Sequence, residues 1–222
     1  MESKNIKHFI VLALIVCLVS YVGLLKLSSD VNAEDLSYED TTKARLSKMV
    51  ESFELISPTQ VLESKLLAFV SAESGLDYEA SQFMIDKCRS KGIDLFLVLG
   101  LIQNESKFNV NATGSSGEIG LGQLMEKTAA HYSNILGYSF SREASYEPKR
   151  NIDLLVEHLS YLYQTVGDDI HGVLTAYNRG VGGMQAYVSR GASPYGSATM
   201  SDYSVRVIEK MEVFRAKFKG ID

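Results

Sequence analysis

Residues 94–105 read DLFLVLGLIQNE, an almost unbroken apolar run that ends in a carboxylate. A run of this length is typical of a buried helix, and a period of 3.6 residues places Glu105 on one face with Val98 and Leu101. Burial disfavours the charged form of an acid, so we expect the pKa of Glu105 to rise toward the range in which it donates a proton at neutral pH. A lone glutamate at a helix end more often reaches water, so this prediction depends on the segments that follow.

A glycine-rich segment follows the acid and reads TGSSGEIGLGQLM at residues 113–125. Its four glycines let the backbone adopt positive φ and approach a ligand closely. The segment lacks the Gly-Lys-Ser/Thr ending of a phosphate-binding loop and the Gly-x-Gly-x-x-Gly spacing after a strand, which argues against a nucleotide site. A third segment, AYNRGVG at residues 176–182, combines a phenol, an amide and another glycine-rich turn.

Together these segments resemble the lytic transglycosylase catalytic domain of the soluble-lytic-transglycosylase type, whose lysozyme-like fold is shared with goose-type lysozyme. The resemblance runs from about residue 78 to about residue 218 and depends on four blocks in order. The blocks are ESKFN at 105–109, GSSGEIGLGQ at 114–123, NI at 151–152 and AYNRGVG at 176–182. Tyr203 matches a tyrosine near the end of the family's domain.

The sequence departs from the family pattern at three positions. Gly122 stands where methionine is usual, Leu155 where glycine is usual, and His158 where tyrosine is usual. The missing side chain at position 122 affects the cleft wall and therefore leaves the glycan preference open. We expect the changes at 155 and 158 to adjust packing behind the cleft more than the chemistry.

The resemblance implies that peptidoglycan is the substrate and that Glu105 is the catalytic residue. Glu105 would protonate the oxygen between N-acetylmuramic acid and N-acetylglucosamine. The muramyl C6 hydroxyl would then attack C1 while Glu105 takes its proton, giving a 1,6-anhydromuramyl end. Ordinary glycosidases use two carboxylates. None of the acids between Glu105 and Asn151, Glu118 included, matches a second catalytic position of the family.

Further side chains would orient the sugar and stabilise developing charge with preplaced dipoles, as the resemblance implies. These substrate-binding residues are Ser106, Gly120, Gln123, Tyr177, Asn178 and Tyr203. The resemblance implies no cofactor. No metal site is expected either, since the four histidines are far apart and no His-Glu-x-x-His pattern is present.

The amino terminus contains an uncharged, mostly apolar run at residues 9–25, preceded by Lys4 and Lys7. Its length is at the short limit for a transmembrane helix and slightly long for the core of a signal peptide. Positive residues before the run favour an inside amino terminus. We therefore expect a single-pass anchor in the cytoplasmic membrane with the catalytic domain outside, and secretion after cleavage near Ala33 stays open as the alternative.

Composition and periodicity predict three parts: a membrane anchor or signal segment at 1–27, an acidic tether and amphipathic helical stalk at 28–77, and a helical body at 78–222. The resemblance implies that this body is a lysozyme-like catalytic domain. The catalytic domain should be mainly α, with at most a small β-hairpin near residues 114–123. Its helical patterns cover about 80–91, 95–107, 126–136, 151–166, 170–178, 181–189 and 203–217. Two further amphipathic helices, within residues 41–75, could form a stalk, a packing extension or a surface that recruits an envelope-spanning machine.

Charge and cysteine content reduce the number of possible functions. The body is near neutral and no basic cluster alternates with aromatic residues, so we expect no nucleic-acid partner. Cys88 is the only exported cysteine, which excludes an intramolecular disulfide. Three functions stay open: a membrane-tethered lytic transglycosylase, a goose-lysozyme-type muramidase that uses water, and an assembly factor of a secretion or conjugation machine with accessory wall-opening activity. The lack of a second acid favours the first over the second.

Overall fold

The computed structural model describes residues 41–45, 47 and 57–221, and the chain divides into two compact units, residues 1–58 and 59–222. In the first unit, residues 41–45 and 47 are helical. The apolar run expected to cross the membrane lies outside the described residues. Within the part of the chain that the structure describes, no helix has the length and apolar character needed to span a membrane.

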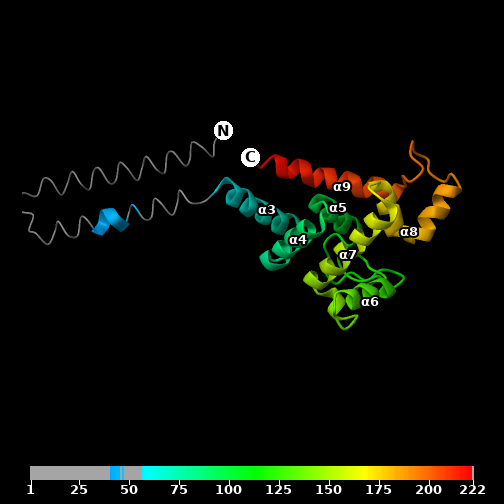
Figure 1. The fold of residues 1–222 in the computed structure, drawn as a ribbon, viewed down its shortest axis with the longest axis horizontal. Helices are drawn as coiled ribbons and strands as arrows, with labels where there is room; N and C mark the ends of the chain where they lie inside the picture. The colour runs from blue at the N-terminus through cyan, green and yellow to red at the C-terminus, as the bar shows by residue number, and fades with distance from the viewer. Residues whose placement is uncertain (1–40, 46, 48–56, 222) are drawn as a thin grey trace, which may run out of the picture. The chain divides into compact units, whose positions relative to one another are not determined.

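The second unit is built from helices joined by loops (Figure 1). In chain order these are α3 (Pro58–Ser74), α4 (Tyr78–Lys91), α5 (Leu95–Glu105), α6 (Glu126–Ile135), the 3-10 helix η1 (Ala144–Tyr146), α7 (Pro148–Val166), α8 (Ile170–Ser189) and α9 (Asp202–Lys219). In residues 57–221, isolated antiparallel bridges take the place of strands and pair Ile119 with Thr113 and Leu124. The expectation of a mainly helical domain with at most a small hairpin is therefore confirmed.

Polar caps set where α5 and α9 begin. The Asp94 side chain accepts a hydrogen bond from Phe96 N at 2.8 Å at the start of α5. Ser201 and Ser204 form a reciprocal capping box at the start of α9. Each cap satisfies backbone N–H groups that the first turn of a helix leaves unpaired. The two helices that matter most for the site therefore have defined starting residues.

Helix α5 is the buried helix of the domain and packs along α9. Every residue from Leu97 to Ile102 is buried, as expected of a helix that is apolar on all sides. Gly100 faces the α9 backbone, because a Cβ at this position would lie 2.7 Å from Met211 N and 2.8 Å from Val207 O. The missing side chain therefore allows the two helices to approach to backbone contact.

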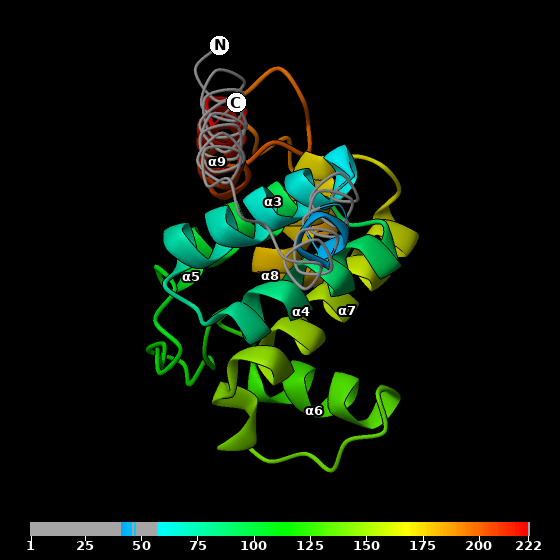
Figure 2. The same ribbon diagram turned by 90° about the vertical axis from the view of Figure 1, so that its left-hand side faces the viewer.

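Helices α4, α6 and α8 are arranged about α7. Helices α9 and α6 lie at opposite ends of the unit in both views (Figures 1 and 2). Helix α7 packs against α4, α6 and α8 and so connects the two ends. Helix α8 is broken at Gly180, whose backbone has φ 71° and ψ 161°, which agrees with the two helical patterns expected at 170–178 and 181–189.

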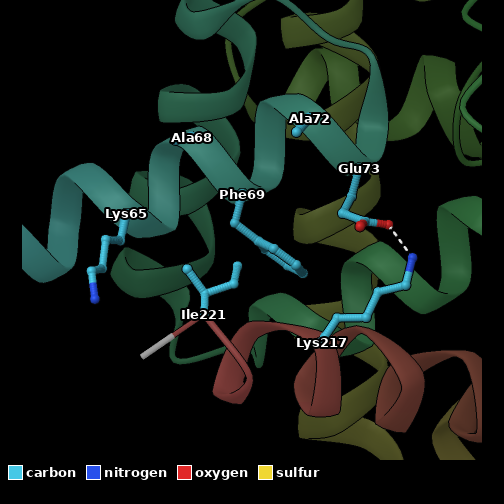
Figure 3. Close-up of a pocket in the computed structure, with 7 residues that line it drawn as sticks. All are labelled: Lys65, Ala68, Phe69, Ala72, Glu73, Lys217 and Ile221. Carbon is cyan, nitrogen blue, oxygen red and sulfur yellow. Dashed lines mark hydrogen bonds and ion pairs between the residues drawn. The ribbon is translucent and has the colours of Figure 1, made fainter. Parts of the chain in front are cut away.

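Helix α3 packs on the C-terminal end of the chain. The Phe69 ring lies 5.3 Å from the Phe218 ring, and Lys217 Nζ lies 2.6 Å from a carboxylate oxygen of Glu73. An open groove beside these contacts is lined by Lys65, Ala68, Phe69, Ala72, Glu73, Lys217 and Ile221 (Figure 3). The amphipathic pattern at residues 59–75 therefore forms a packing extension of the same compact unit.

The close approach of α5 and α9 makes Gly100 sensitive to substitution. We expect Gly100→Ala to lower the free energy of unfolding by about 1–3 kcal/mol, because its methyl group would enter the α9 backbone. Urea denaturation followed by circular dichroism measures this change. Gly182→Ala is the matched control: this exposed glycine of α8 has open space around a Cβ, so the change should be neutral or stabilise by about 0.5–1 kcal/mol. Equal effects at both positions would contradict the packing argument.

Candidate active site

Glu105 is the last residue of α5, at the point where the buried helix reaches the loop side of the domain. Its side chain is partly buried, and its Oε1 accepts a hydrogen bond from the Tyr203 hydroxyl. Tyr203 is buried in the first turn of α9. The packing of α5 on α9 therefore brings together two residues that are 98 positions apart in the sequence.

The surroundings of Glu105 raise its pKa above the ordinary value of 4.5, and burial is the largest cause. Hydrogen bonds from Tyr203 and Asn104 act in the opposite direction, since they favour the carboxylate. Of the nearby charges, the Glu118 carboxylate raises this pKa and the Arg206 guanidinium lowers it. The rise expected from the sequence is confirmed, so Glu105 keeps its proton to a higher pH than an exposed glutamate does.

The glycine-rich loop is held by its own side chains and backbone. Gln123 adopts a left-handed backbone with φ 47°, and its Nε2 donates hydrogen bonds to Gly120 O at 2.8 Å and Ala112 O at 3.1 Å. Gly120 also has positive φ, and a Cβ there would lie 2.6 Å from Asn151 Nδ2. The predicted binding residues Gly120 and Gln123 therefore also determine the shape of the loop.

Asn151 attaches this loop to α7. Its buried Oδ1 accepts from Gly122 N at 2.8 Å, and its Nδ2 donates to Ile119 O at 3.1 Å and Ser145 O at 2.8 Å. A buried amide with all of these partners satisfies backbone groups that the short bridges leave unpaired. The sequence identified Asn151 as part of a motif but assigned it no role, because its partners lie up to 32 residues away.

Tyr177 comes from α8 and contacts the same loop. Its hydroxyl donates to Gly122 O at 2.7 Å. Burial raises the pKa of Tyr177 well above its usual value, and the negative charge of Glu105 raises it further. Tyr177 therefore lies within electrostatic reach of the acid and stays a neutral hydrogen-bond donor at physiological pH.

Two of the departures from the family pattern prove to be neighbours. A Cβ at Gly122 would lie 3.3 Å from Leu155 Cδ1 and 3.1 Å from Tyr177 Oη. Leu155 is fully buried on α7, so its side chain fills the space beside the glycine. This placement agrees with the expectation that position 155 adjusts packing.

The third departure, His158, lies behind Tyr177. Its Nδ1 is 3.1 Å from the Tyr132 hydroxyl oxygen, and its ring centre is 5.2 Å from that of Tyr177. Burial lowers the pKa of His158 to about 4, and the nearby His131 contributes in the same direction. The neutral imidazole is thus a packing group between Tyr132 and Tyr177.

Ser106 and Asn178 are the remaining predicted substrate-binding residues. Ser106 caps the C-terminus of α5, and its hydroxyl donates to Ile102 O at 3.3 Å. Asn178 is exposed on α8, two residues before the break at Gly180. Their roles in binding stay predictions.

Sequence reasoning gave no role at the acid to two charged residues, Arg206 and Glu118. Arg206 follows Tyr203 by three residues on α9, so helical spacing could have indicated that both face Glu105. Glu118 lies in an irregular loop, where no periodicity relates it to α5. Its influence on Glu105 follows only from the fold.

Comparison with known proteins identifies the family. The model of the transglycosylase SLT domain matches residues 82–195, just over half of the chain. The chain belongs to this family. The match begins inside α4 and ends after α8, so the SLT domain includes Glu105, the glycine-rich loop and Tyr177.

Relatives with known names match a similar part of the chain. Two proteins named membrane-bound lytic murein transglycosylase C, from Edwardsiella ictaluri and from Photorhabdus laumondii, are 34% and 37% identical over 101 residues. Each match covers 41% of this chain and 28% of the relative. The chain therefore spans less than a third of the length of these relatives.

Solved structures share the fold of the SLT domain. An inactive mutant of the lytic transglycosylase Slt from Pseudomonas aeruginosa matches 62% of this chain and 24% of its own, with a TM-score of 0.55 and 20% identity. The 70-kDa soluble lytic transglycosylase in complex with bulgecin A matches 68% of this chain and 26% of its own, with a TM-score of 0.56 and 21% identity. The expected lysozyme-like fold is therefore confirmed.

The hydrogen bond from Tyr203 to Glu105 can be tested through its effect on the pKa of Glu105. Because the bond favours the carboxylate, Tyr203→Phe should raise the pKa of Glu105 further. Carboxyl ¹³C NMR titration measures this pKa, with the Glu105→Gln spectrum used to assign the signal. A lower pKa in Tyr203→Phe would show that the hydroxyl stabilises the protonated acid instead.

Because of the low pKa of His158, we expect the free energy of unfolding of the SLT domain to fall in acid. Its pKa of about 4 in the folded protein lies below the ordinary 6.5, so the unfolded chain binds the proton more tightly. The contribution of neutral His158 to the free energy of unfolding is therefore fully present above pH 6.5. It is lost as the pH drops toward 4, by about 3 kcal/mol in all. Urea denaturation at several pH values should show a flatter profile for His158→Gln. An unchanged profile in folded His158→Gln would assign the effect to other groups.

Proposed function

We propose that this chain is a peptidoglycan lytic transglycosylase in which Glu105 acts first as general acid and then as general base. One observation carries the proposal. Glu105, the last residue of α5 in an SLT-family domain, is a partly buried acid with a raised pKa that accepts a hydrogen bond from Tyr203. The names of the relatives support the same reaction class. An acid that keeps its proton to a higher pH than an exposed glutamate does is suited to protonating a glycosidic oxygen.

In the first step, the Glu105 proton passes to the oxygen between N-acetylmuramic acid and N-acetylglucosamine. The bond from this oxygen to the muramyl C1 breaks, and positive charge develops at C1. The Glu105 carboxylate that remains accepts the Tyr203 hydrogen bond, which favours the charged form of the acid. Tyr203 therefore lowers the cost of leaving a charge in a partly buried position.

In the second step, the muramyl C6 hydroxyl attacks C1 and its proton passes to Glu105. A 1,6-anhydro ring forms and the acid is restored, so one carboxyl group completes the cycle. The nucleophile belongs to the substrate and is already close to C1, which removes the need for a carboxylate nucleophile from the protein. Tyr177, held by its hydrogen bond to Gly122 O at 2.7 Å, would limit how the sugar can lie beside the acid.

We also propose the arrangement of the whole chain. Residues 1–27 would anchor it in the cytoplasmic membrane, residues 28–77 would form the tether and helical segment, and residues 78–222 would act on the cell wall outside. The apolar run at 9–25 and the names of the membrane-bound relatives support the anchor. Recruitment to an envelope-spanning machine would use the amphipathic segments within residues 41–75.

The products of the full chain on purified peptidoglycan test the reaction. We expect released sugars with 1,6-anhydromuramyl ends, identified by liquid chromatography and mass spectrometry. Glu105→Gln should reduce their release by about 10²–10⁴-fold, because no proton donor is left. Glu209→Gln, which removes an exposed carboxylate from α9, is the control and should have no effect.

Other products would redirect the assignment. Reducing muramic acid ends, heavier by one water, would identify a hydrolase in place of a transglycosylase. Absence of both products from folded wild-type protein would remove the basis for a catalytic function.

A further inference from the structure

Glu118 occupies a defined place in the glycine-rich loop. Its backbone carbonyl accepts from Gly114 N at 3.0 Å, and the next residue, Ile119, exchanges hydrogen bonds with Leu124 at 2.9 and 3.1 Å. The side chain turns back over the loop, where Ser116 N donates to Oε2 at 2.9 Å. The carboxylate is therefore held against the loop and is partly buried.

Gly114 makes room for this carboxylate and for the amide of Gln123. A Cβ at position 114 would lie 2.1 Å from Glu118 Oε2 and 2.8 Å from Gln123 Oε1. The two oxygens thus surround the same small region beside Gly114. A side chain there would displace the Glu118 carboxylate or the Gln123 amide, so the glycine leaves room for both.

The orientation of the Gln123 amide follows from its other contacts. Its Nε2 donates to two backbone carbonyls, at 2.8 and 3.1 Å, so Oε1 is the end that faces Glu118. Two acceptor oxygens cannot bond each other, and both have lone pairs left to use. A donor from outside, such as a sugar hydroxyl or the N–H of an N-acetyl group, can complete such a pair.

The Glu118 charge also reaches the catalytic acid. It raises the pKa of Glu105, as burial does. The groups that face Glu105 from the packed helices are Tyr203 and Arg206 on α9 and Tyr177 on α8. Of these, Arg206 carries the opposing charge, so Glu118 is the carboxylate that favours the protonated acid needed in the first step.

We propose that Glu118 is a substrate-binding residue whose Oε2, paired with Gln123 Oε1, accepts hydrogen bonds from a donor group of the glycan beside Glu105. The proposal rests on the proposed function, because it takes the glycan as the ligand. It assigns Glu118 a binding and electrostatic role, with no covalent step. A purely structural role would instead limit Glu118 to capping the turn through Ser116 N.

Glu118→Gln separates these two roles. The substituted amide oxygen can still accept from Ser116 N, so the turn keeps its cap, while the charge is lost. Glu209→Gln on α9 is the matched control for loss of one negative charge. Glu118→Asp keeps the charge but shortens the side chain, and it provides a second variant if Glu118→Gln does not fold.

The first measurement is the ¹³C NMR titration of Glu105 in the full chain, which needs no substrate. We expect Glu118→Gln to lower the pKa of Glu105, opposite in direction to Tyr203→Phe, and Glu209→Gln to leave it unchanged. The second is the pH profile of cleavage of purified glycan strands. Glu118→Gln should move the alkaline limb of kcat/KM to lower pH and raise KM roughly tenfold, with kcat on the pH plateau nearly unchanged. Glu118→Asp should raise KM without that shift of the limb.

An unchanged Glu105 titration together with an unchanged KM in folded Glu118→Gln would overturn the proposal and leave Glu118 as a turn cap. A shifted titration with an unchanged KM would also overturn it, since substrate contact is its central statement. If wild-type protein cleaves no glycan, the proposed function fails first. In that case the affinity of wild type and Glu118→Gln for tetra-N-acetylchitotetraose, measured by calorimetry, decides the binding role, and equal affinities would reject it.

Discussion

Backbone contact between α5 and α9 is the constraint on which the site depends. Gly100 allows this contact because a side chain there would meet the α9 backbone within 2.8 Å. The consequence appears one turn and a half later along α5, where Glu105 meets Tyr203. A wider spacing between the two helices would separate acid and phenol and admit water between them. The desolvation that raises the pKa of Glu105 is therefore a result of helix packing as much as of the local sequence.

The glycine-rich loop is built differently, because side chains replace regular secondary structure there. The loop at residues 113–125 contains only isolated bridges, yet its buried peptide groups are satisfied by the Asn151 amide, the Gln123 amide and the Tyr177 hydroxyl. Buried N–H and C=O groups without partners would be costly. These three side chains thus allow an irregular loop to be a fixed part of the site.

Much of the fold and part of the candidate site could be predicted from the sequence. The helices follow from apolar residues at 3.6-residue spacing, and the break in α8 follows from Gly180. The burial of Glu105 follows from the run that precedes it. By contrast, three features join segments about 13 to 33 residues apart. They are the effect of the Glu118 charge on Glu105, the contacts of Asn151 with the loop, and the contact of Leu155 with Gly122. Local patterns do not encode such contacts, because they depend on how helices and loops pack.

The meeting of Gly122 with Leu155 has a consequence for engineering chimeric proteins. The bulk beside Tyr177 is supplied by α7 here, whereas the family pattern places a methionine on the loop and a glycine on the helix. A loop transplanted alone from a relative would bring a second bulky group into space that Leu155 already fills. A helix transplanted alone would leave that space empty. The loop and α7 thus form one exchangeable module, and recombination boundaries belong outside both.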